Sequence, residues 1–412
     1  MPDDSFELRV EEMVHGGNAL GRDGRRVIFV PYVIPGERIR ARVIDDRKGF
    51  AFAEATDVLK TVPERVTPRC AHFGPGECGG CHFQHIEYEA QLRFKRDVVI
   101  DQLTRIGGFY KPPVRPTIAS PDPWQYRSSA TFHVDEDGNL CYVRTDGQSL
   151  IAIEECYIIR PELLELFYEL DLDIPELDRV RLQTGSNGDP MVILSTKDDE
   201  APELEVTLPV SINFLLSDNE PVNLIGSSHL DYVVRGRTFR VTAGGFFQVN
   251  VPQAEKLVEL VLDRLNLKGR ETVLDLYSGV GLFTAFIAER ASLVVSVESY
   301  PPAVTDADEN LADLDNVDLV EGGVEDVLPD LEGPFDAVVL DPPRAGIDAR
   351  ALDELVRLAP RTIVYVSCEP STLARDAKRL VQKGYELVEV QPVDMFPQTY
   401  HIECVAHFRR AR

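Results

Sequence analysis

Two side chains near the carboxyl end of the sequence are of types that perform covalent catalysis. Cys368 follows the β-forming stretch 362–366 and precedes a Pro-Ser-Thr segment that is typical of a helix start. A thiolate beside a helix N-terminus is stabilised and becomes nucleophilic. Glu403 is a carboxylate in an otherwise apolar stretch, where burial would raise its pKa and allow proton exchange near neutral pH. Each residue also has an ordinary interpretation, as a core thiol or as a surface carboxylate of an edge strand.

A glycine turn and two carboxylates mark a candidate nucleotide site. In DLYSGVGLF, Gly279 and Gly281 are one residue apart, where a backbone passes close to a ligand. Glu298 ends the next apolar stretch, as an acidic residue does when it binds a ribose. GVGLFT lacks the third glycine of the dinucleotide fingerprint, which disfavours a nicotinamide dehydrogenase but not S-adenosylmethionine, which has no pyrophosphate. Asp341 begins DPPRAG, whose two prolines stiffen a turn that would hold the carboxylate at a strand end.

Three cysteines in a Gly/Pro-rich segment indicate an inorganic centre. Seven residues separate Cys70 from Cys78, and two separate Cys78 from Cys81, which is a common spacing of metal ligands. Cys156 is the candidate for a fourth ligand, with Cys141 as its rival. Four cysteines suit either zinc or an iron–sulfur cluster, so the spacing leaves the metal open. The alternative is a set of unconnected buried thiols.

Composition places limits on where the protein works and what it contacts. The chain has 412 residues, enough for two or three domains, and a formal net charge of -26. It shows no apolar run near the roughly 18 residues of a membrane span and no secretory signal, so we expect a soluble, cytoplasmic protein. Residues 1–115 carry 18 Lys+Arg against 17 Asp+Glu, and the remainder carries 25 against 52. Any basic face for RNA must therefore be local.

The expected elements divide the chain into three domains. Residues 1–60 alternate short apolar strands with Gly and Pro, which predicts a small antiparallel barrel with arginines in or beside its strands. Residues 61–245 mix strands and helices, and their stretch WQYR at 124–127 could clamp a nucleotide or be ordinary core. Residues 246–412 alternate strands with helices, which predicts a parallel sheet covered on both faces, closed by an antiparallel hairpin.

Five motifs together resemble the RNA uracil-5-methyltransferase family. They are GGFFQVN, DLYSGVG, DPPRAG, SCEPSTLARD and DMFPQTYHIE. The barrel resembles the TRAM domain of the ribosomal-RNA members of this family, and the cysteine segment resembles their [4Fe-4S] site. The resemblance covers nearly the whole chain and thins between about 160 and 240. It implies an α/β protein with an OB-like TRAM barrel, a mixed α+β central domain and a Rossmann-like class I methyltransferase domain.

The resemblance also implies a role for each matched residue. Cys368 would add to C6 of uracil, S-adenosylmethionine would supply the methyl group, and Glu403 would remove the C5 proton. The implied cofactor contacts, beside the glycine turn, are Gln248, Tyr277, Glu298 and Asp341. The implied ligands of the [4Fe-4S] cluster are Cys70, Cys78, Cys81 and Cys156.

A few positions depart from the family pattern. Leu282 stands where an Asn often contacts the cofactor, Ser278 replaces a common Cys, and Gly323 stands where a polar contact is expected. The first cysteine spacing of seven residues is longer than the expected five. These departures bear on cofactor affinity and cluster geometry, not on the reaction.

The implied function is the formation of 5-methyluridine in RNA. Large-subunit (23S) ribosomal RNA is the expected substrate, and uridine in the T-loop of tRNA is the alternative. Two further hypotheses are a cytosine-5-methyltransferase and a non-catalytic RNA-binding or folding factor. We expect a monomer that binds RNA and no membrane, and a target base that must leave its stack to reach Cys368.

Overall fold

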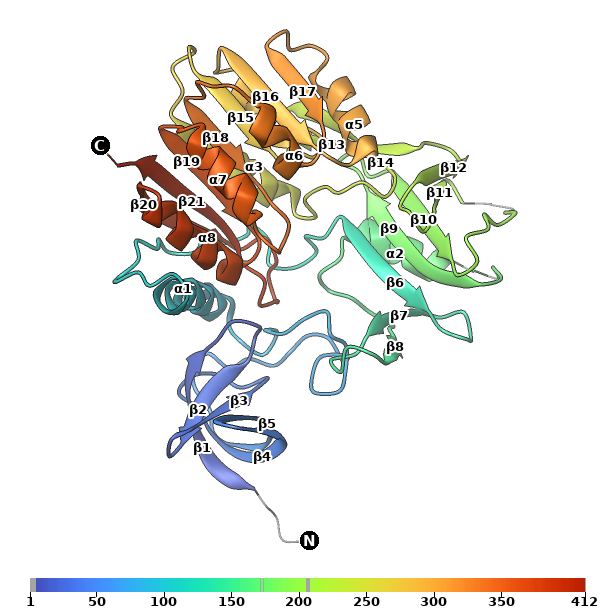
Figure 1. Ribbon diagram of the computed structural model, residues 1–412. Helices are drawn as coiled ribbons and strands as arrows, with labels where there is room; N and C mark the ends of the chain where they lie inside the picture. The colour runs from blue at the N-terminus through green and yellow to red at the C-terminus, as the bar shows by residue number, and fades with distance from the viewer. Residues whose placement is uncertain (1–4, 171, 173, 205–207, 412) are drawn as a thin grey trace.

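The first five strands form a closed barrel at one end of the molecule (Figure 1). The computed structural model describes residues 5–170, 172, 174–204 and 208–411. The barrel strands pair in the order β1-β2-β3-β5-β4, with the bounds β1 Phe6–Met13, β2 Ala19–Asp23, β3 Arg26–Val30, β4 Arg38–Arg47 and β5 Phe50–Lys60. Along β1 the side chains alternate, so that Leu8 and Val10 are buried while their neighbours are exposed. The predicted small barrel is confirmed, but it is not antiparallel throughout, because β3 and β5 pair in parallel.

A seven-stranded sheet and its own hydrophobic core form the middle of the chain. The strands pair in the order β12-β11-β10-β9-β6-β7-β8, antiparallel except for β10 with β11. Their bounds are β6 Ser129–Val134, β7 Leu140–Val143, β8 Leu150–Ala152, β9 Leu177–Thr184, β10 Pro190–Thr196, β11 Ser211–Leu215 and β12 Pro221–Ile225. Helix α2 (Pro161–Glu169) buries Leu163 and Leu166 in this core. The mixed character predicted for this region is confirmed.

The last sheet combines five parallel strands with a closing antiparallel pair. Its order is β17-β16-β15-β18-β19-β21-β20, and the bounds are β15 Thr272–Leu276, β16 Leu293–Glu298, β17 Val317–Glu321, β18 Ala337–Leu340, β19 Thr362–Ser367, β20 Tyr385–Val393 and β21 Glu403–Arg410. The strand order reverses between β15 and β18. In open α/β sheets, ligands bind beyond the carboxyl ends of the strands at such a reversal.

Helices cover both faces of this sheet, as the alternating sequence pattern predicts. One core includes α3 (Val251–Leu265), α4 (Leu282–Ala288) and α5 (Pro301–Leu311). The opposite core includes residues of α6 (Val324–Val327), α7 (Ala349–Arg357) and α8 (Pro370–Gln382). A hairpin of β13 (His229–Val234) and β14 (Arg237–Thr242) packs against α3 and α5. The layers around the sheet therefore include residues before 246.

Strand β21 lies inside the sheet, between β19 and β20. It pairs antiparallel with β20, which confirms the predicted closing hairpin, and antiparallel with β19. Residues 394–402 connect β20 to β21, and this segment is called the β20–β21 loop below. Because β21 runs against its neighbours, its first residue lies at the same edge as the carboxyl ends of the parallel strands.

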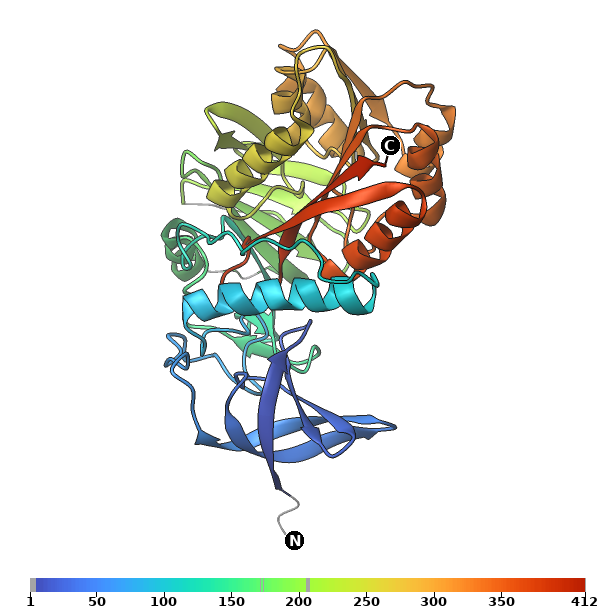
Figure 2. The same cartoon turned by 90° about the vertical axis from the view of Figure 1, so that its left-hand side faces the viewer.

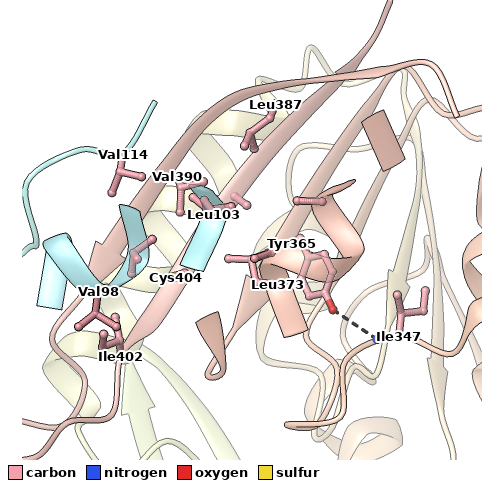
Figure 3. Packing of buried hydrophobic residues seen from close by; sticks show 14 of the residues in the cluster. Val98, Leu103, Val114, Ile347, Tyr365, Leu373, Leu387, Val390, Ile402 and Cys404 are labelled. Carbon is pink, nitrogen blue, oxygen red and sulfur yellow. Dashed lines mark hydrogen bonds between the residues drawn. The ribbon is translucent and has the colours of Figure 1, made fainter. Parts of the chain in front are cut away.

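Helix α1 (Tyr88–Arg105) runs between the barrel and the last sheet (Figure 2). Its Val98 and Leu103 pack in one cluster with Val390 and Cys404 of the closing hairpin (Figure 3). The same cluster continues into the barrel core. A shared apolar core of this kind couples the parts rigidly, since separating them would expose buried surface to water.

Among the described residues, none of the helices has the length and apolar character that crossing a membrane requires.

Candidate active site at the strand ends

The pairing of β19 with β21 brings Cys368 and Glu403 together. Thr362 pairs with Arg409, and the antiparallel register continues to Ser367 opposite Cys404. The next step in that register places Cys368 opposite Glu403, at the edge where the parallel strands end. A thiol and a carboxyl group 35 positions apart in the chain therefore face one site because of strand pairing alone.

Glu403 is a buried carboxyl group with an unsatisfied oxygen. It is 3% exposed, and its Oε1 atom has no hydrogen-bond partner among residues 5–411 that are described. Burial raises the pKa of Glu403 well above its ordinary value, the neighbouring Asp341 raises it further, and Arg344 lowers it. An acid that keeps its proton near neutral pH can exchange it with a substrate. The interpretation of Glu403 as an edge-strand surface residue is excluded.

Cys368 is partly exposed at the same edge, directly before the cap of α8. Glu369 is the N-cap residue, and its carboxylate accepts hydrogen bonds from Ser371 N at 3.1 Å and Ser371 Oγ at 2.6 Å. Burial, together with Glu403 and Asp341, raises the pKa of Cys368 to about 12, although Arg344 acts in the opposite direction. The prediction that the helix N-terminus lowers the pKa of this thiol is therefore wrong, since burial and two nearby carboxyl groups raise it.

Asp341 follows β18 at the point where the strand order reverses. Its backbone N–H donates to the Leu276 carbonyl oxygen at 3.3 Å. Burial raises the pKa of Asp341 to about 7. Arg344, three residues later, is exposed and lies 3.3 Å from Nδ1 of His401 through its Nη2 atom. The DPPRAG turn thus places a carboxyl group and a guanidinium beside Glu403, with opposite effects on its pKa.

The glycine turn leaves open space beside its backbone. Tyr277, which follows β15, has a φ of 61°, a left-handed conformation that is costly for a residue with a side chain. Gly279 has a φ of 56°, and a Cβ placed there would meet no atom of the described residues within 4 Å. A Cβ at Gly281 would lie 2.9 Å from Cδ1 of Leu311. Gly279 therefore fits a close ligand, whereas for Gly281 the structure shows a packing reason.

Glu298 closes this turn from the neighbouring strand. Its Oε2 accepts from Gly279 N at 2.8 Å, and its Oε1 accepts from Ser299 N at 2.7 Å and Tyr300 N at 2.8 Å. A carboxylate has about four acceptor positions on its two oxygens, so it can also accept from a ribose hydroxyl. Beneath the turn, Asp275 accepts from Thr284 Oγ1 at 2.6 Å. Burial raises the pKa of Asp275 to about 7.

Gln248 is buried in the segment between β14 and α3, where it is 7% exposed. At the three positions that depart from the family pattern, Leu282 is buried at the start of α4, Ser278 donates to the Val297 carbonyl oxygen at 3.4 Å, and Gly323 is the N-cap of α6. Each of these three residues thus has a place in the local structure of the methyltransferase sheet and its helices.

Four of the seven cysteines line one cavity of about 180 Å³ beside the central sheet: Cys70, Cys78, Cys81 and Cys156. Cys141 does not line it, and its thiol instead donates to Asp135 Oδ2 at 3.5 Å. Burial raises the pKa of Cys70 to about 11 and that of Cys78 above its ordinary value. A bound metal centre would therefore displace thiol protons. Within the described part of the chain, no three His, Cys, Asp or Glu side chains are grouped tightly enough to hold a single metal ion.

The side chains of the WQYR stretch make contacts within the protein. Tyr126 is 6% exposed, and its hydroxyl donates to the Pro397 carbonyl oxygen at 3.0 Å. The guanidinium of Arg69 lies 4.7 Å above the ring of Trp124, and Arg127 lines the cysteine cavity. These three side chains have neighbours within the protein, so the ordinary interpretation of this stretch is the better one.

Sequence reasoning missed the charged residues that hold the β20–β21 loop. Lys95 of α1 is 1% exposed, and its Nζ atom lies 2.5 Å from Oδ1 of Asp394. The same Nζ donates to the Phe396 carbonyl oxygen at 3.0 Å. A lysine in an amphipathic helix gives no signal of such a role, because its partner is 299 positions away in the chain. The sequence likewise gives no signal that Arg344 of DPPRAG lies near Glu403, because only the fold brings these two residues together.

Comparison with known proteins agrees with this architecture. A family model described as tRNA (uracil-5-)-methyltransferase matches residues 227–411, and a TRAM domain model matches residues 4–56. An uncharacterized RNA methyltransferase of Halalkalibacterium halodurans is 35% identical, covering 98% of this chain and 96% of its own. One of Streptomyces avermitilis is also 35% identical, covering 98% of each chain.

A solved structure shares nearly the whole fold. It is the Pyrococcus abyssi tRNA (uracil-54, C5)-methyltransferase in complex with S-adenosyl-L-homocysteine, with a TM-score of 0.74 and 27% identity over 97% of this chain and 100% of that one. The matched family, the full-length relatives and this fold agree with one another. The chain belongs to the RNA uracil-5-methyltransferase family.

Proposed function

We propose that the protein methylates C5 of a uridine in RNA through Cys368 as nucleophile and Glu403 as base. The observation that carries this proposal is the β19–β21 register, which sets Cys368 opposite a buried carboxyl group with a free oxygen within the described part of the chain. A pyrimidine C5 is too weak a nucleophile by itself. Addition of a thiolate at C6 gives C5 carbanion character, and a base must then take the C5 proton.

The proposed reaction balances with these two residues. The Cys368 sulfur bonds to C6, and C5 then bonds to the methyl carbon while the broken carbon–sulfur pair stays on the donor sulfur. Glu403 takes the C5 proton. The electrons of that C–H bond restore the C5–C6 double bond, and the Cys368 thiolate leaves. Glu403 must be a carboxylate at this step, a form that Arg344 favours, and its raised pKa then makes that carboxylate a strong base for the C5 proton.

The acidic edge of the sheet fits the methyl donor of this family. When bound, S-adenosylmethionine supplies a methyl group on a positively charged sulfonium. Asp341 at the reversal of strand order would lie near that charge, Asp275 is buried beneath the turn behind it, and Gly279 leaves room beside the turn. After transfer the donor is a neutral thioether, so the attraction that held it weakens. The carboxyl groups thus favour substrate over product.

The positive donor also bears on the raised pKa of Cys368. A cation beside Asp341 and Glu403 offsets the negative charge that disfavours a thiolate. Arg344 already acts in that direction. The raised pKa keeps Cys368 as a thiol until the donor and the RNA together bring it to the reactive thiolate.

We infer that the four-cysteine cavity holds a [4Fe-4S] cluster. The support is that Cys70, Cys78, Cys81 and Cys156 line one cavity, as four thiolate ligands of a cluster must. Such a cluster would tie the segment 70–81 to Cys156 of the central domain. No step of the methylation uses it.

Ribosomal RNA remains the first candidate substrate, from the resemblance of the motifs. The P. abyssi protein gives tRNA specific support, because a protein named for tRNA uracil-54 matches 97% of this chain. That match extends over the barrel and the central domain. Their presence therefore does not separate ribosomal RNA from tRNA as substrate.

The experiment that tests the reaction uses RNA carrying tritium at uracil C5. Wild-type protein with S-adenosylmethionine should release tritium and leave 5-methyluridine in the RNA digest, and Cys368→Ala should do neither. Cys404→Ala is the matched control, because this buried thiol lies next to Glu403 and is not assigned a role.

Two substrates in the same assay separate the candidate functions. Release from 23S ribosomal RNA but not from tRNA supports the first candidate, and the reverse supports the second. Methylation by Cys368→Ala at the wild-type rate would contradict the proposed nucleophile. Absence of release from both RNAs, with cofactor bound, would contradict uracil methylation altogether.

A further inference from the structure

The β20–β21 loop carries the chain into Glu403, yet other parts of the protein hold it. Gln398 in the middle of the loop has a φ of 67°, a left-handed conformation that persists only where the surroundings impose it. It is 2% exposed. Glu403 lies only five positions after Gln398, so the placement of this residue bears directly on the proposed base.

The cysteine segment, taken here with the residues His82 and Phe83 that follow it, supplies the first set of contacts. The backbone N–H groups of His82 and Phe83 both donate to the Gln398 carbonyl oxygen, each at 2.9 Å. His82 directly follows Cys81, which lines the cysteine cavity. The two residues that follow the last cysteine of the segment therefore both bind one carbonyl oxygen of the loop.

Helix α1 supplies the second set through one buried amide. Gln91 Nε2 donates to Gln398 Oε1 at 3.0 Å, and Gln398 N donates to Gln91 Oε1 at 3.1 Å. The same Nε2 also donates to the Phe83 carbonyl oxygen at 3.1 Å. Gln91 is fully buried. It thus binds the cysteine segment and the loop at the same time, where any lost hydrogen bond leaves a buried polar group unpaired.

Further contacts on the amino-terminal side of Gln398 hold the first part of the loop. Tyr126 holds the Pro397 carbonyl oxygen, and Lys95 holds Asp394 and the Phe396 carbonyl oxygen. These partners come from α1 and from the segment just before β6. Because residues 394–397 are held in this way, a displacement of the cysteine segment at Gln398 would act on the residues that follow it, which lead to Glu403.

We propose that Gln91 and Gln398 are positioning residues that transmit the geometry of the cysteine segment to Glu403. An ordered cavity then speeds proton removal from C5, although the cavity takes no part in the chemistry. This inference rests on the proposed role of Glu403. It assigns the cysteine cavity a purpose in the step that follows methyl transfer, because a misplaced base leaves the earlier addition by Cys368 intact.

The first test replaces the amides with an apolar side chain of similar size. Gln91→Met and Gln398→Met are compared with Gln102→Met, which lies about three turns along the same helix, where its amide donates to Asp101 at 3.1 Å. Slow proton removal leaves methylated RNA attached to Cys368. We expect RNA–protein adduct that survives denaturation to rise roughly tenfold or more in the first two variants, with kcat lower and KM near wild type.

The second test needs no turnover. Hydrogen exchange of the peptide 394–403 is measured in protein as purified with its iron, and again after the iron is removed by a chelator. Faster exchange without iron, and faster exchange in Gln91→Met with its iron content unchanged, is the expected result. Equal exchange in all of these samples would overturn the inference.

The outcomes separate this inference from the proposed function. If wild type releases tritium and Gln91→Met and Gln398→Met form no more adduct than Gln102→Met, the inference fails and the function stands. If wild type neither methylates nor forms adduct, the function fails. Gln398→Met removes fewer hydrogen bonds than Gln91→Met, so its adduct level decides the matter where Gln91→Met does not fold.

Discussion

Nε2 of His15 lies 3.0 Å from Oε1 of Glu369, which joins the barrel to the residue directly after Cys368. The contact is reinforced by the ring of Tyr400, which lies near His15 and against Gly17 of the same barrel turn. The barrel therefore contacts the N-cap of α8, directly after the proposed nucleophile. Changes in the barrel turn should alter the surroundings of Cys368.

Glu369→Gln should lower stability in a way that depends on pH. Burial alone would raise the pKa of Glu369, but hydrogen bonds from His15 and Ser371 lower it to about 2. A carboxylate with a lowered pKa stabilises the fold above its unfolded pKa of about 4.3 and loses that contribution as pH falls toward the folded value. The deficit in Tm of the variant should be full at pH 6 and shrink steadily below pH 4. A deficit independent of pH would contradict this account.

Glu403→Gln should abolish turnover and raise thermal stability at neutral pH. Because the folded pKa of Glu403 is raised, the wild type holds this carboxyl protonated at a cost that begins above its unfolded pKa and grows with pH. The amide has no such cost. We expect a gain in Tm of roughly 1–3 °C at pH 7 that disappears near pH 4. Calorimetry at both pH values checks it, with Glu386→Gln on exposed β20 surface as the control.

Binding of S-adenosylmethionine should release protons, and binding of S-adenosylhomocysteine should release fewer. Burial raises the pKa of Asp341 and of Asp275 to about 7, so both are partly protonated at neutral pH. A sulfonium cation favours the charged carboxylate and lowers both pKa values, whereas a neutral thioether does not. Titration calorimetry at pH 7 in buffers of different ionisation enthalpy measures the difference. Equal release by the two ligands would place the sulfonium away from these acids.

Cys156→Ser should lose most of the iron, and Cys141→Ser should keep it. Cys156 lines the cavity with the other three cysteines, whereas Cys141 bonds to Asp135 away from it. Removing one of four ligands weakens a metal centre strongly, since affinity comes from all of them. Protein purified without oxygen is assayed for iron and for visible absorbance. Iron retained by Cys156→Ser and lost from Cys141→Ser would reverse the assignment.

The order of strands and helices was predictable from sequence, and the environment of the site was not. Alternating apolar stretches and glycine turns predict the barrel and the covered parallel sheet, because they depend on local pattern. The environment of Glu403 is an example of what the local sequence pattern does not predict. Its burial follows from the place of β21 between β19 and β20, a choice among sheet orders that no local pattern makes.

The pKa of Cys368 could not be predicted from the sequence either, because it depends on charges from distant parts of the chain. A cysteine before a helix suggests a stabilised thiolate, but burial and the nearby Glu403 raise the pKa instead. Likewise, spacing left Cys141 and Cys156 as rivals, and the fold of the central domain placed Cys156 in the cavity. Both the pKa of Cys368 and the choice of the fourth cysteine depend on residues that are far away in the sequence.

The position of β21 also constrains the order in which the enzyme can assemble as it is synthesised. β20 leaves the ribosome before β21, yet it has no direct neighbour in β19, because β21 must enter between them. The sheet therefore cannot grow by simple addition in sequence order, and non-local pairing of this kind folds slowly. The base arrives on the strand that completes the sheet. A nascent chain can thus build the barrel and the central domain early, while the reaction centre forms only when that strand has been inserted.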